Sequence, residues 1–365
     1  MKIHYLVTSL ETGGAEFAIP DIVTTLQNLG HEVSIIACEP RDLGAVPRLE
    51  AAGLSYTLLA SRRRKLPIIL ATYLALTRRD RPDIIWTSLS FGNLVGQCAA
   101  KLLAIPVISF KHSASVRRYT YRLRHWSTLW VGDSQTVVEY LRENMQIPAE
   151  KVFPWPLFQS DAHAPQAVPW DGKSRLHIGS VGRLHEVKQY AALIDALATF
   201  IDKNPDLRTR VQLTILGDGP ERQALEDKII EKNLQDIVSL PGFSAEVNTF
   251  LSSLHLYVQP SRYEGMCLAL HEAMNVGLPV MATPVGEMRD AVQEGKTGFV
   301  LEGTLETALD SALRQVFAHP ERLEDYGIQA RDYVLQKFSH QQFVNAAERI
   351  LAQLPFTPTQ RYSVE

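Results

Sequence analysis

Residues 260–275 join a glycine turn to two carboxylates, a combination that suits the binding of an anionic ligand. An apolar run ends near Pro260, and helical periodicity begins at Leu268, so Glu264 and Gly265 fall on the loop between a strand and a helix. Gly265 lets the backbone turn sharply, so the free amides at the helix N-terminus can face a phosphate. These amides belong to Met266, Cys267 and Leu268.

Two acids, Glu264 and Glu272, frame this turn. Glu264 precedes the helix, where the helix dipole stabilises a carboxylate, and Glu272 lies in the helix about two turns beyond Glu264, where it can reach ligand hydroxyl groups. The pair can also be read as a helix-start residue and an exposed surface residue. Their register with a strand-end glycine favours a ligand site.

A second loop carries two cations, Arg183 and Lys188, just after a strand predicted to end at Gly182. Cations five residues apart on such a loop can converge on one diphosphate. Arginine binds oxygens bidentately, while lysine acts as a mobile point charge. The alternative is a pair of solvated surface charges.

Gly13 and Gly14 follow the first predicted strand and precede a helix. They allow close approach of a ligand to the backbone, although a tight turn without any ligand has the same pattern. The dinucleotide fingerprint G-x-G-x-x-G is absent, which argues against a nicotinamide-dependent dehydrogenase.

Short apolar runs alternate with helical patterns along the whole chain, which predicts βα units and parallel sheets. Strands are predicted at 3–8, 32–37, 55–59, 84–87, 106–110 and 129–132, then at 177–182, 211–216, 237–240, 256–259, 280–282 and 299–300. Helices are predicted at 15–29, 93–103, 187–202, 220–232 and 268–275.

This order predicts an α/β protein of two Rossmann-like, doubly wound domains, 1–165 and 166–340. The stretch 160–173 has linker composition, and a helix within 341–365 is expected to pack back on the first domain. Ligands of such sheets bind beyond the carboxyl ends of the strands, so the expected site is a cleft between two facing domains.

The two halves of the chain differ in charge. Residues 1–160 hold 18 Lys and Arg against 13 Asp and Glu, and the remainder holds 19 against 27. The three cysteines are far apart and suit neither a disulfide framework nor a metal site. Because the first ten residues are too polar for a secretory signal and no apolar run is long enough to span a membrane, a cytoplasmic protein is expected.

Basic residues cluster at two places in the first half. Arg62, Arg63, Arg64 and Lys65 precede an apolar run, and the stretch 111–126 has five Lys and Arg, including Arg117 and Arg118, among aromatic residues. Such patterns suit an anionic membrane surface or a lipid-diphosphate acceptor. A solvated basic face is an equal alternative, and nucleic acid is disfavoured because no known binding module is present.

Taken together, these motifs resemble those of the large retaining GT-B glycosyltransferase family that includes bacterial cell-envelope sugar transferases, family 4. The resemblance rests on Glu264-x7-Glu272 with Pro260-Ser261 before it and Ala273-Met274 after it. It extends in the same order over Gly13–Glu16, Val181–Leu184 with Lys188, Gly217–Pro220, Thr283–Gly286 and Gly295–Gly298.

The resemblance implies a role for each motif. Arg183 and Lys188 would hold the donor diphosphate with the amides after Gly265, Glu272 would bind ribose hydroxyls, and Glu264 would bind the donor sugar. Gly13, Gly14 and Gly182 would let the backbone approach the phosphates, and His112 corresponds to a family histidine beside the transferred sugar.

This chain also departs from the family pattern. The usual E-G-F-G loop is Glu264-Gly265-Met266-Cys267, where the cysteine could crowd the donor pocket or set its shape. The paired glycines of the last segment become Gly286-Glu287, and an Asn-Gly turn is replaced by Pro154-Trp155-Pro156-Leu157. These changes bear on which donor is bound rather than on the phosphate chemistry.

The sequence therefore predicts a retaining, metal-independent glycosyltransferase without a cofactor. It would transfer a hexose or N-acetylhexosamine from a nucleotide diphosphate sugar, UDP favoured, to a glycan or lipid-linked acceptor in envelope polysaccharide biosynthesis. Peripheral association with the inner face of the cell membrane is a further expectation. Two alternatives stay open: a sugar-nucleotide 2-epimerase of the same fold and a non-catalytic nucleotide-sugar-binding protein.

Overall fold

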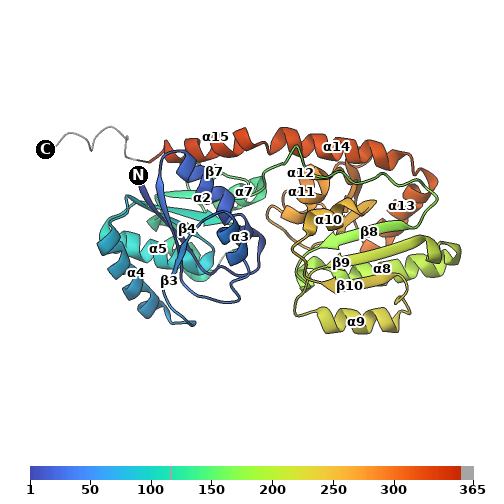
Figure 1. The fold of residues 1–365 in the computed structure, drawn as a ribbon, viewed down its shortest axis with the longest axis horizontal. Helices are drawn as coiled ribbons and strands as arrows, with labels where there is room; N and C mark the ends of the chain where they lie inside the picture. The colour runs from blue at the N-terminus through green and yellow to red at the C-terminus, as the bar shows by residue number, and fades with distance from the viewer. Residues whose placement is uncertain (116, 355–365) are drawn as a thin grey trace. The chain divides into compact units, whose positions relative to one another are not determined.

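The computed structural model describes residues 1–115 and 117–354, and its contacts divide the chain into two units (Figure 1). Unit 1 holds residues 1–157 and the C-terminal segment from His340, and unit 2 holds residues 158–339. The predicted boundary at 165 lies inside unit 2, because Phe158 and Ala164 pack into the core of that unit.

Within its described residues, unit 1 has a seven-stranded parallel sheet in the order β3-β2-β1-β4-β5-β6-β7. The chain order reverses between β1 and β4, so a doubly wound sheet is confirmed. The strands are β1 (Lys2–Val7), β2 (Glu32–Ala37), β3 (Tyr56–Leu58), β4 (Ile84–Ser88), β5 (Val107–Lys111), β6 (Leu129–Gly132) and β7 (Val152–Pro154). The edge strand β7 was not expected from the sequence; it is three residues long and ends in proline, which only an edge tolerates.

Helices cover both faces of this sheet. They are α1 (Gly14–Phe17), α2 (Ile19–Asn28), α3 (Val46–Ala51), α4 (Leu66–Asp80), α5 (Ser90–Leu103), α6 (Arg118–Leu123) and α7 (Gln135–Glu143), with single 3₁₀ turns at Arg124–Trp126 and Ala149–Lys151. The sequence predicts one continuous helix over 15–29, which is wrong, because the structure has the two helices α1 and α2 there. The helix breaks at Ala18 because Pro20, at the start of α2, has no N–H to donate to the preceding turn.

The C-terminal helix α15 (His340–Leu351) belongs to unit 1, where it contacts α2. Its buried residues are Phe343, Ala347 and Ile350. The Phe343 ring lies 5.1 Å from the ring of Trp155, which follows β7. The amphipathic pattern of this segment therefore marks a helix with one face in the core of unit 1.

Unit 2 has a six-stranded parallel sheet within its described residues, in the order β10-β9-β8-β11-β12-β13. The strands are β8 (Leu176–Val181), β9 (Val211–Leu216), β10 (Val238–Gly242), β11 (Leu256–Gln259), β12 (Val280–Ala282) and β13 (Gly298–Val300). The helices are α8 (Tyr190–Lys203), α9 (Arg222–Glu231), α10 (Val247–Ser252), α11 (Leu268–Asn275), α12 (Met288–Ala291), α13 (Leu305–Ala318) and α14 (Arg322–Lys337), with 3₁₀ turns at Glu186–Lys188 and Pro205–Arg210.

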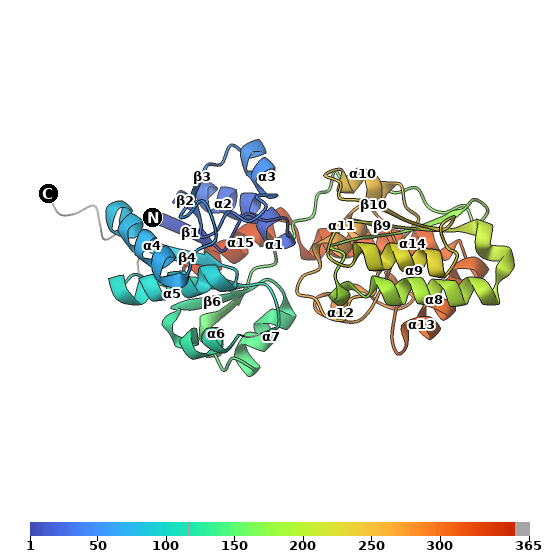
Figure 2. The same cartoon turned by 90° about the horizontal axis from the view of Figure 1, so that it is seen from below.

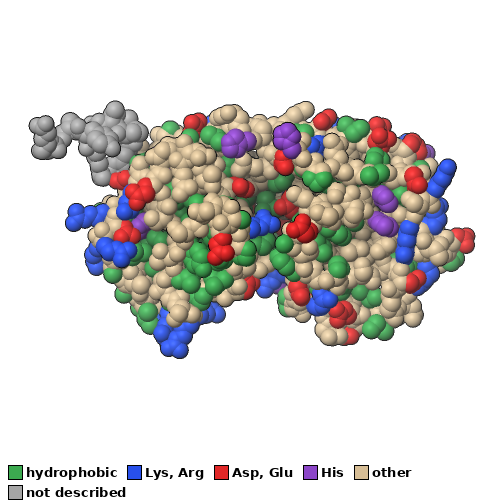
Figure 3. All heavy atoms as spheres, viewed as in Figure 1, with side chains coloured by type: hydrophobic (Ala, Val, Ile, Leu, Met, Phe, Trp, Pro, Cys, Tyr) green, Lys and Arg blue, Asp and Glu red, His purple; other side chains and the backbone are tan. Residues whose placement is uncertain are grey.

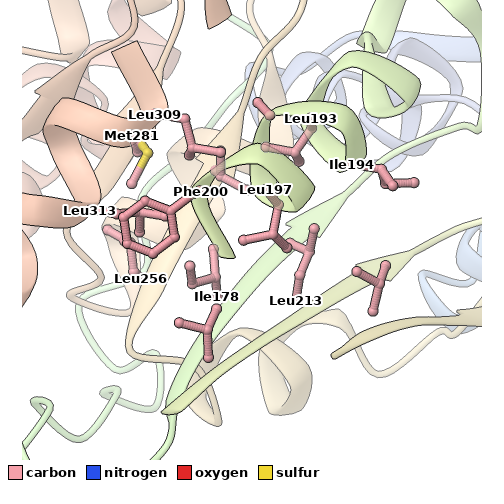
Figure 4. Close-up of a cluster of buried hydrophobic side chains, with 14 of the residues drawn as sticks. Ile178, Leu193, Ile194, Leu197, Phe200, Leu213, Leu256, Met281, Leu309 and Leu313 are labelled. Carbon is pink, nitrogen blue, oxygen red and sulfur yellow. The ribbon is translucent and has the colours of Figure 1, made fainter. Parts of the chain in front are cut away.

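Two apolar layers hold the helices of unit 2 to its sheet. Side chains of α8, α9 and α13 form one layer with the strands, and Figure 4 shows Leu193, Leu197 and Phe200 of α8 in one cluster with Ile178 of β8 and Leu309 of α13. Side chains of α10, α11, α12 and the C-terminal half of α14 form the other layer. In Figure 2 α8 and α9 lie in front of the sheet. Both layers leave the carboxyl ends of the strands free to carry loops.

Candidate functional site

The candidate donor site lies at the carboxyl ends of β8 and β11 in unit 2. These two strands are direct neighbours in the sheet, so the loop after Val181 and the loop after Gln259 lie side by side. The structure joins them through an ion pair between Lys188 Nζ and Glu264 Oε1, 2.6 Å apart. It thus brings together two predicted site residues that are 76 positions apart in the sequence.

Glu264 is held from both sides. Besides Lys188, its Oε1 accepts a hydrogen bond from Ser261 Oγ at 2.6 Å, and Ser261 in turn accepts from Gln259 Nε2 at 2.8 Å. Burial alone lowers the pKa of Lys188, but the charge of Glu264, its hydrogen bond and weaker neighbouring contributions together outweigh burial and raise the pKa, so the amine is cationic at neutral pH. The ion pair therefore holds the charged amine of Lys188 in one position at the strand end.

Arg183 is the second cation of this edge. It is exposed, directly follows the Gly182 strand end, and makes no hydrogen bond or ion pair with any residue in the described ranges. Its guanidinium is therefore available to an anionic ligand. Lys188 lies in a 3₁₀ turn rather than in the predicted helix over 187–202, because the chain turns at Gln189 before α8 begins.

The glycine turn leads into α11 through Cys267, which occupies the N-cap position in a left-handed conformation with φ 54° and ψ 67°. Non-glycine residues rarely adopt this conformation. The Cys267 side chain packs in the apolar layer with α11, and burial raises the pKa of its thiol. Met266 is buried in the same layer, so the turn offers backbone rather than side chains at this point.

Replacing Cys267 with glycine and with alanine tests this conformation. Alanine loses the buried sulfur and keeps the left-handed strain, whereas glycine removes a strain of about 1 kcal/mol. We expect the Cys267→Gly variant to be more stable than Cys267→Ala, because glycine adopts the left-handed conformation without strain and is also the better N-cap residue. Urea unfolding of the two variants measures the difference, and a more stable alanine variant would contradict it.

In unit 1, Gly13 and Gly14 begin α1, the first helix after β1. A side chain at Gly13 would collide with the carboxylate of Glu16, which folds back over it. Glu16 is only 4% exposed, and burial raises its pKa to about 7. Sequence reasoning placed the glycines but assigned no role to Glu16; an acid in the first turn after two glycines was the available signal.

His112 lies at the carboxyl end of β5, between side chains from both neighbouring strands. Its Nε2 is 2.7 Å from Ser88 Oγ at the end of β4, and its Nδ1 is 3.5 Å from Asp133 Oδ2 just after β6. Lys111 is buried beside them, which lowers its pKa to about 8 although the charge of Asp133 opposes the shift. Ser88 and Asp133 were missed by sequence reasoning, although each is a polar residue at the end of a buried strand.

If His112 acts on the reactants, Asp133 should affect turnover only through His112, so the effects of substituting the two residues should not add. We expect Asp133→Asn to lower turnover about tenfold, because the amide keeps the shape and removes the charge behind the imidazole. The double variant with His112→Ala should be no slower than His112→Ala alone. Steady-state rates of the three variants decide this, and additive losses would show that Asp133 acts independently.

The two basic segments are exposed. Arg62, Arg64 and Lys65 lie before α4, with Arg63 Nε 3.7 Å from Glu39 Oε1, and Ile68 on the first turn of α4 is 51% exposed. Arg117 and Arg118 are exposed at the start of α6, and Val116 lies outside the described residues. Figure 3 shows Lys and Arg side chains gathered near the end of unit 1 that carries α4.

Two family models match the chain, one over each half. Glycosyltransferase Family 4 matches residues 12–158 and Glycosyl transferases group 1 matches residues 166–333, so nearly all of the motif series is covered. The chain belongs to the GT-B glycosyltransferases of the family 4 type. The resemblance seen in the sequence is thereby confirmed.

Curated relatives align with part of this family 4 chain. It is 32% identical over 188 residues to a putative colanic acid biosynthesis glycosyltransferase, WcaL, of Salmonella typhimurium, which is 49% of this chain and 44% of that protein. It is 30% identical over 187 residues to the D-inositol 3-phosphate glycosyltransferase of Corynebacterium urealyticum, 50% of this chain and 43% of that protein. The chain thus spans less than half the length of these relatives.

Solved structures align over almost the full length. HepE of Anabaena in complex with UDP-glucose superposes with a TM-score of 0.84 at 19% identity, over 97% of this chain and 100% of that chain. Sucrose-phosphate synthase of Thermosynechococcus elongatus gives a TM-score of 0.79 at 19% identity, over 97% and 98%. These likenesses confirm the predicted fold of two Rossmann-like domains.

No helix within residues 1–115 and 117–354 is both long and apolar enough to cross a membrane. In the same ranges, no group of three or more His, Cys, Asp and Glu side chains is arranged to hold a metal ion.

Proposed function

We propose that this chain is a retaining glycosyltransferase that moves a hexose or N-acetylhexosamine from a nucleotide diphosphate sugar to a glycan or lipid-linked acceptor. The observation that carries the proposal is the Lys188–Glu264 pair beside the glycine turn, with Arg183 on the adjoining loop, whose guanidinium has no partner among residues 1–115 and 117–354. Cations and helix amides at one sheet edge are the groups that bind a diphosphate.

On this proposal the protein supplies positive charge where the leaving diphosphate gains negative charge. Lys188 and Arg183 stabilise that charge, and the amides before α11 add oriented dipoles that need no reorganisation. No metal ion is required for this step. Glu264 keeps Lys188 charged and positioned, and its free oxygen faces the donor sugar. A donor phosphate oxygen accepts the proton of the acceptor hydroxyl during attack on the same face.

UDP is the favoured nucleotide. HepE, with the same fold, was solved with UDP and with UDP-glucose. The envelope role draws support from the name of the colanic acid relative. In unit 1, His112 is proposed to lie beside the transferred sugar and the Gly13–Gly14 loop to approach the donor phosphates. In unit 2, Glu272 is proposed to bind the ribose and Glu264 the donor sugar.

The proposal is tested in two steps. A screen of UDP-, GDP- and ADP-sugars by thermal unfolding identifies the donor, because a ligand that binds only the folded state raises the midpoint. NMR of the reaction with that donor and added glycan acceptors then follows the new anomeric proton. Transfer with retained configuration that persists in EDTA supports the proposal. An epimerised donor without transfer, or binding without any turnover, would overturn it in favour of an epimerase or a sensor.

We also propose that the basic segments bring unit 1 to an anionic membrane. Each Lys or Arg near such a surface contributes about 1 kcal/mol, so the double variant Arg62→Ala, Arg64→Ala should bind anionic vesicles about thirtyfold more weakly. Lys203→Ala with Arg314→Ala, two exposed cations of unit 2, is the matched control. Vesicle sedimentation at low and high salt measures binding, and equal loss in both double variants would remove this idea.

A further inference from the structure

Next to the glycine turn of unit 2 lies an ion pair between the buried carboxylate of Glu287 and the partly exposed amine of Lys337. Glu287, at the start of α12, is 3% exposed, and its Oε1 accepts a hydrogen bond from Lys337 Nζ at 2.6 Å. Lys337 is the last residue of α14 and also donates to the hydroxyl of Tyr333 at 2.8 Å. The pair links α12 to the end of α14.

The backbone of the same segment supports the turn. The N–H of Glu287 donates to the carbonyl oxygen of Gly265 at 2.9 Å. Gly286, with φ 58°, lies so close that a Cβ there would come within 2.6 Å of the carbonyl oxygens of Glu264 and Gly265. Residues 286 and 287 therefore pack directly against the carbonyl groups of Glu264 and Gly265 and fix the direction in which these carbonyls point.

Two hydrogen bonds, to Glu287 and to Tyr333, fix the position of the Lys337 amine. Burial alone lowers the pKa of Lys337, but its hydrogen bonds to Glu287 and Tyr333 outweigh this and raise the pKa, so the amine is charged. The cost of desolvating a carboxylate as buried as that of Glu287 often cancels its attraction to a partner, so the pair is weak evidence for a stabilising role. A role in fixing local geometry accounts better for its position.

Phe338, the residue after Lys337, links the end of α14 to a second set of contacts that support the glycine turn. The carbonyl of Phe338 accepts hydrogen bonds from the N–H and Oγ of Ser160, at 2.8 and 3.0 Å. The Phe338 ring is 5.1 Å from the ring of His271, and His271 Nδ1 is 3.0 Å from the carbonyl oxygen of Cys267. Both ends of the glycine turn are thus supported from the segment that ends α14.

We propose that Glu287 and Lys337 are positioning residues for the glycine turn. They keep the carbonyl groups of the turn pointing toward α12, so that its N–H groups face the donor diphosphate. This inference rests on the proposed function, in which that turn binds the diphosphate. Neither side chain touches the ligand; each acts through the backbone of Glu287 and Gly265.

The test is Lys337→Met in the full chain, which keeps the length of the side chain and removes the ammonium group that pairs with Glu287. We expect UDP affinity, measured by calorimetry, to fall about tenfold, the equivalent of one well-placed hydrogen bond, with uridine affinity unchanged. Lys337→Arg should retain most of the UDP affinity. Lys228→Met, which breaks the partly exposed pair with Asp195 at 2.7 Å on α8, is the matched control and should leave both affinities unchanged.

Hydrogen exchange of the amides at 265–268, without any ligand, is the second measurement. Faster exchange there in Lys337→Met but not in Lys228→Met supports the inference. Unchanged exchange and unchanged UDP affinity would overturn it, as would equal losses of UDP and uridine affinity, which indicate general destabilisation. If the wild-type protein binds no nucleoside diphosphate, the proposed function fails, and the exchange result still decides whether the pair supports the turn.

Discussion

The Lys188→Met variant is expected to lose about a thousandfold in kcat/KM and a substantial part of its stability. Lys188 forms an ion pair with Glu264, and its removal takes this cationic partner away from a carboxylate that is only 12% exposed. Loss of one preorganised charge at a developing negative charge costs about 10²–10³ in turnover. Breaking a buried pair costs about 3–5 kcal/mol in folding free energy.

Two controls separate these effects. The double variant Lys188→Met, Glu264→Gln removes the unpaired charge, so most of the stability should return while turnover stays low. Lys228→Met breaks another ion pair in the same unit and should change neither turnover nor donor affinity. Initial rates and urea unfolding measure both quantities. If the double variant regained turnover together with stability, Lys188 would have no direct role at the diphosphate.

The Arg183→Ala variant should show the opposite balance, with turnover reduced about a hundredfold and stability unchanged to within about 0.5 kcal/mol. Arg183 is exposed and has no partner among the described residues, so folding does not depend on it. Its guanidinium interacts with the protein only through a bound anion, and most strongly when the leaving diphosphate carries full charge.

Arg183→Lys distinguishes charge from geometry, because lysine keeps the charge but lacks the planar fork that binds two oxygens. We expect an intermediate rate. The measurement is kcat and KM for the donor at fixed acceptor, with unfolding midpoints as the stability check. Turnover of Arg183→Ala equal to wild type would exclude Arg183 from the reaction.

Arg183 and Lys188 show which features of a binding site can be predicted from local sequence pattern. Both follow a short apolar run that had to be a strand, and the carboxyl end of a parallel strand is where ligands bind. Their placement on strand-end loops needed only the alternation of apolar runs. That Lys188 pairs with Glu264 while Arg183 stays free depends on β8 lying next to β11, which is a property of strand order.

The same distinction explains what was missed. Ser88 and Asp133 meet His112 only because β4, β5 and β6 are consecutive neighbours in the sheet of unit 1. Glu287 appeared in the sequence as a departure from a glycine pair, and nothing local indicated that Lys337, fifty residues later, neutralises it. Pairings between distant segments leave no periodic trace in the chain.

The sequence by itself determined the two parallel-sheet domains, the family, and the glycine turn before α11. Each of these depends on local hydrophobic period, on helix starts, or on residues a few positions apart. The tertiary structure alone decided which charges are paired and that Cys267 is buried in a left-handed conformation. Such outcomes are set by packing and by strand order, because burial and partner distance arise only when remote segments come together.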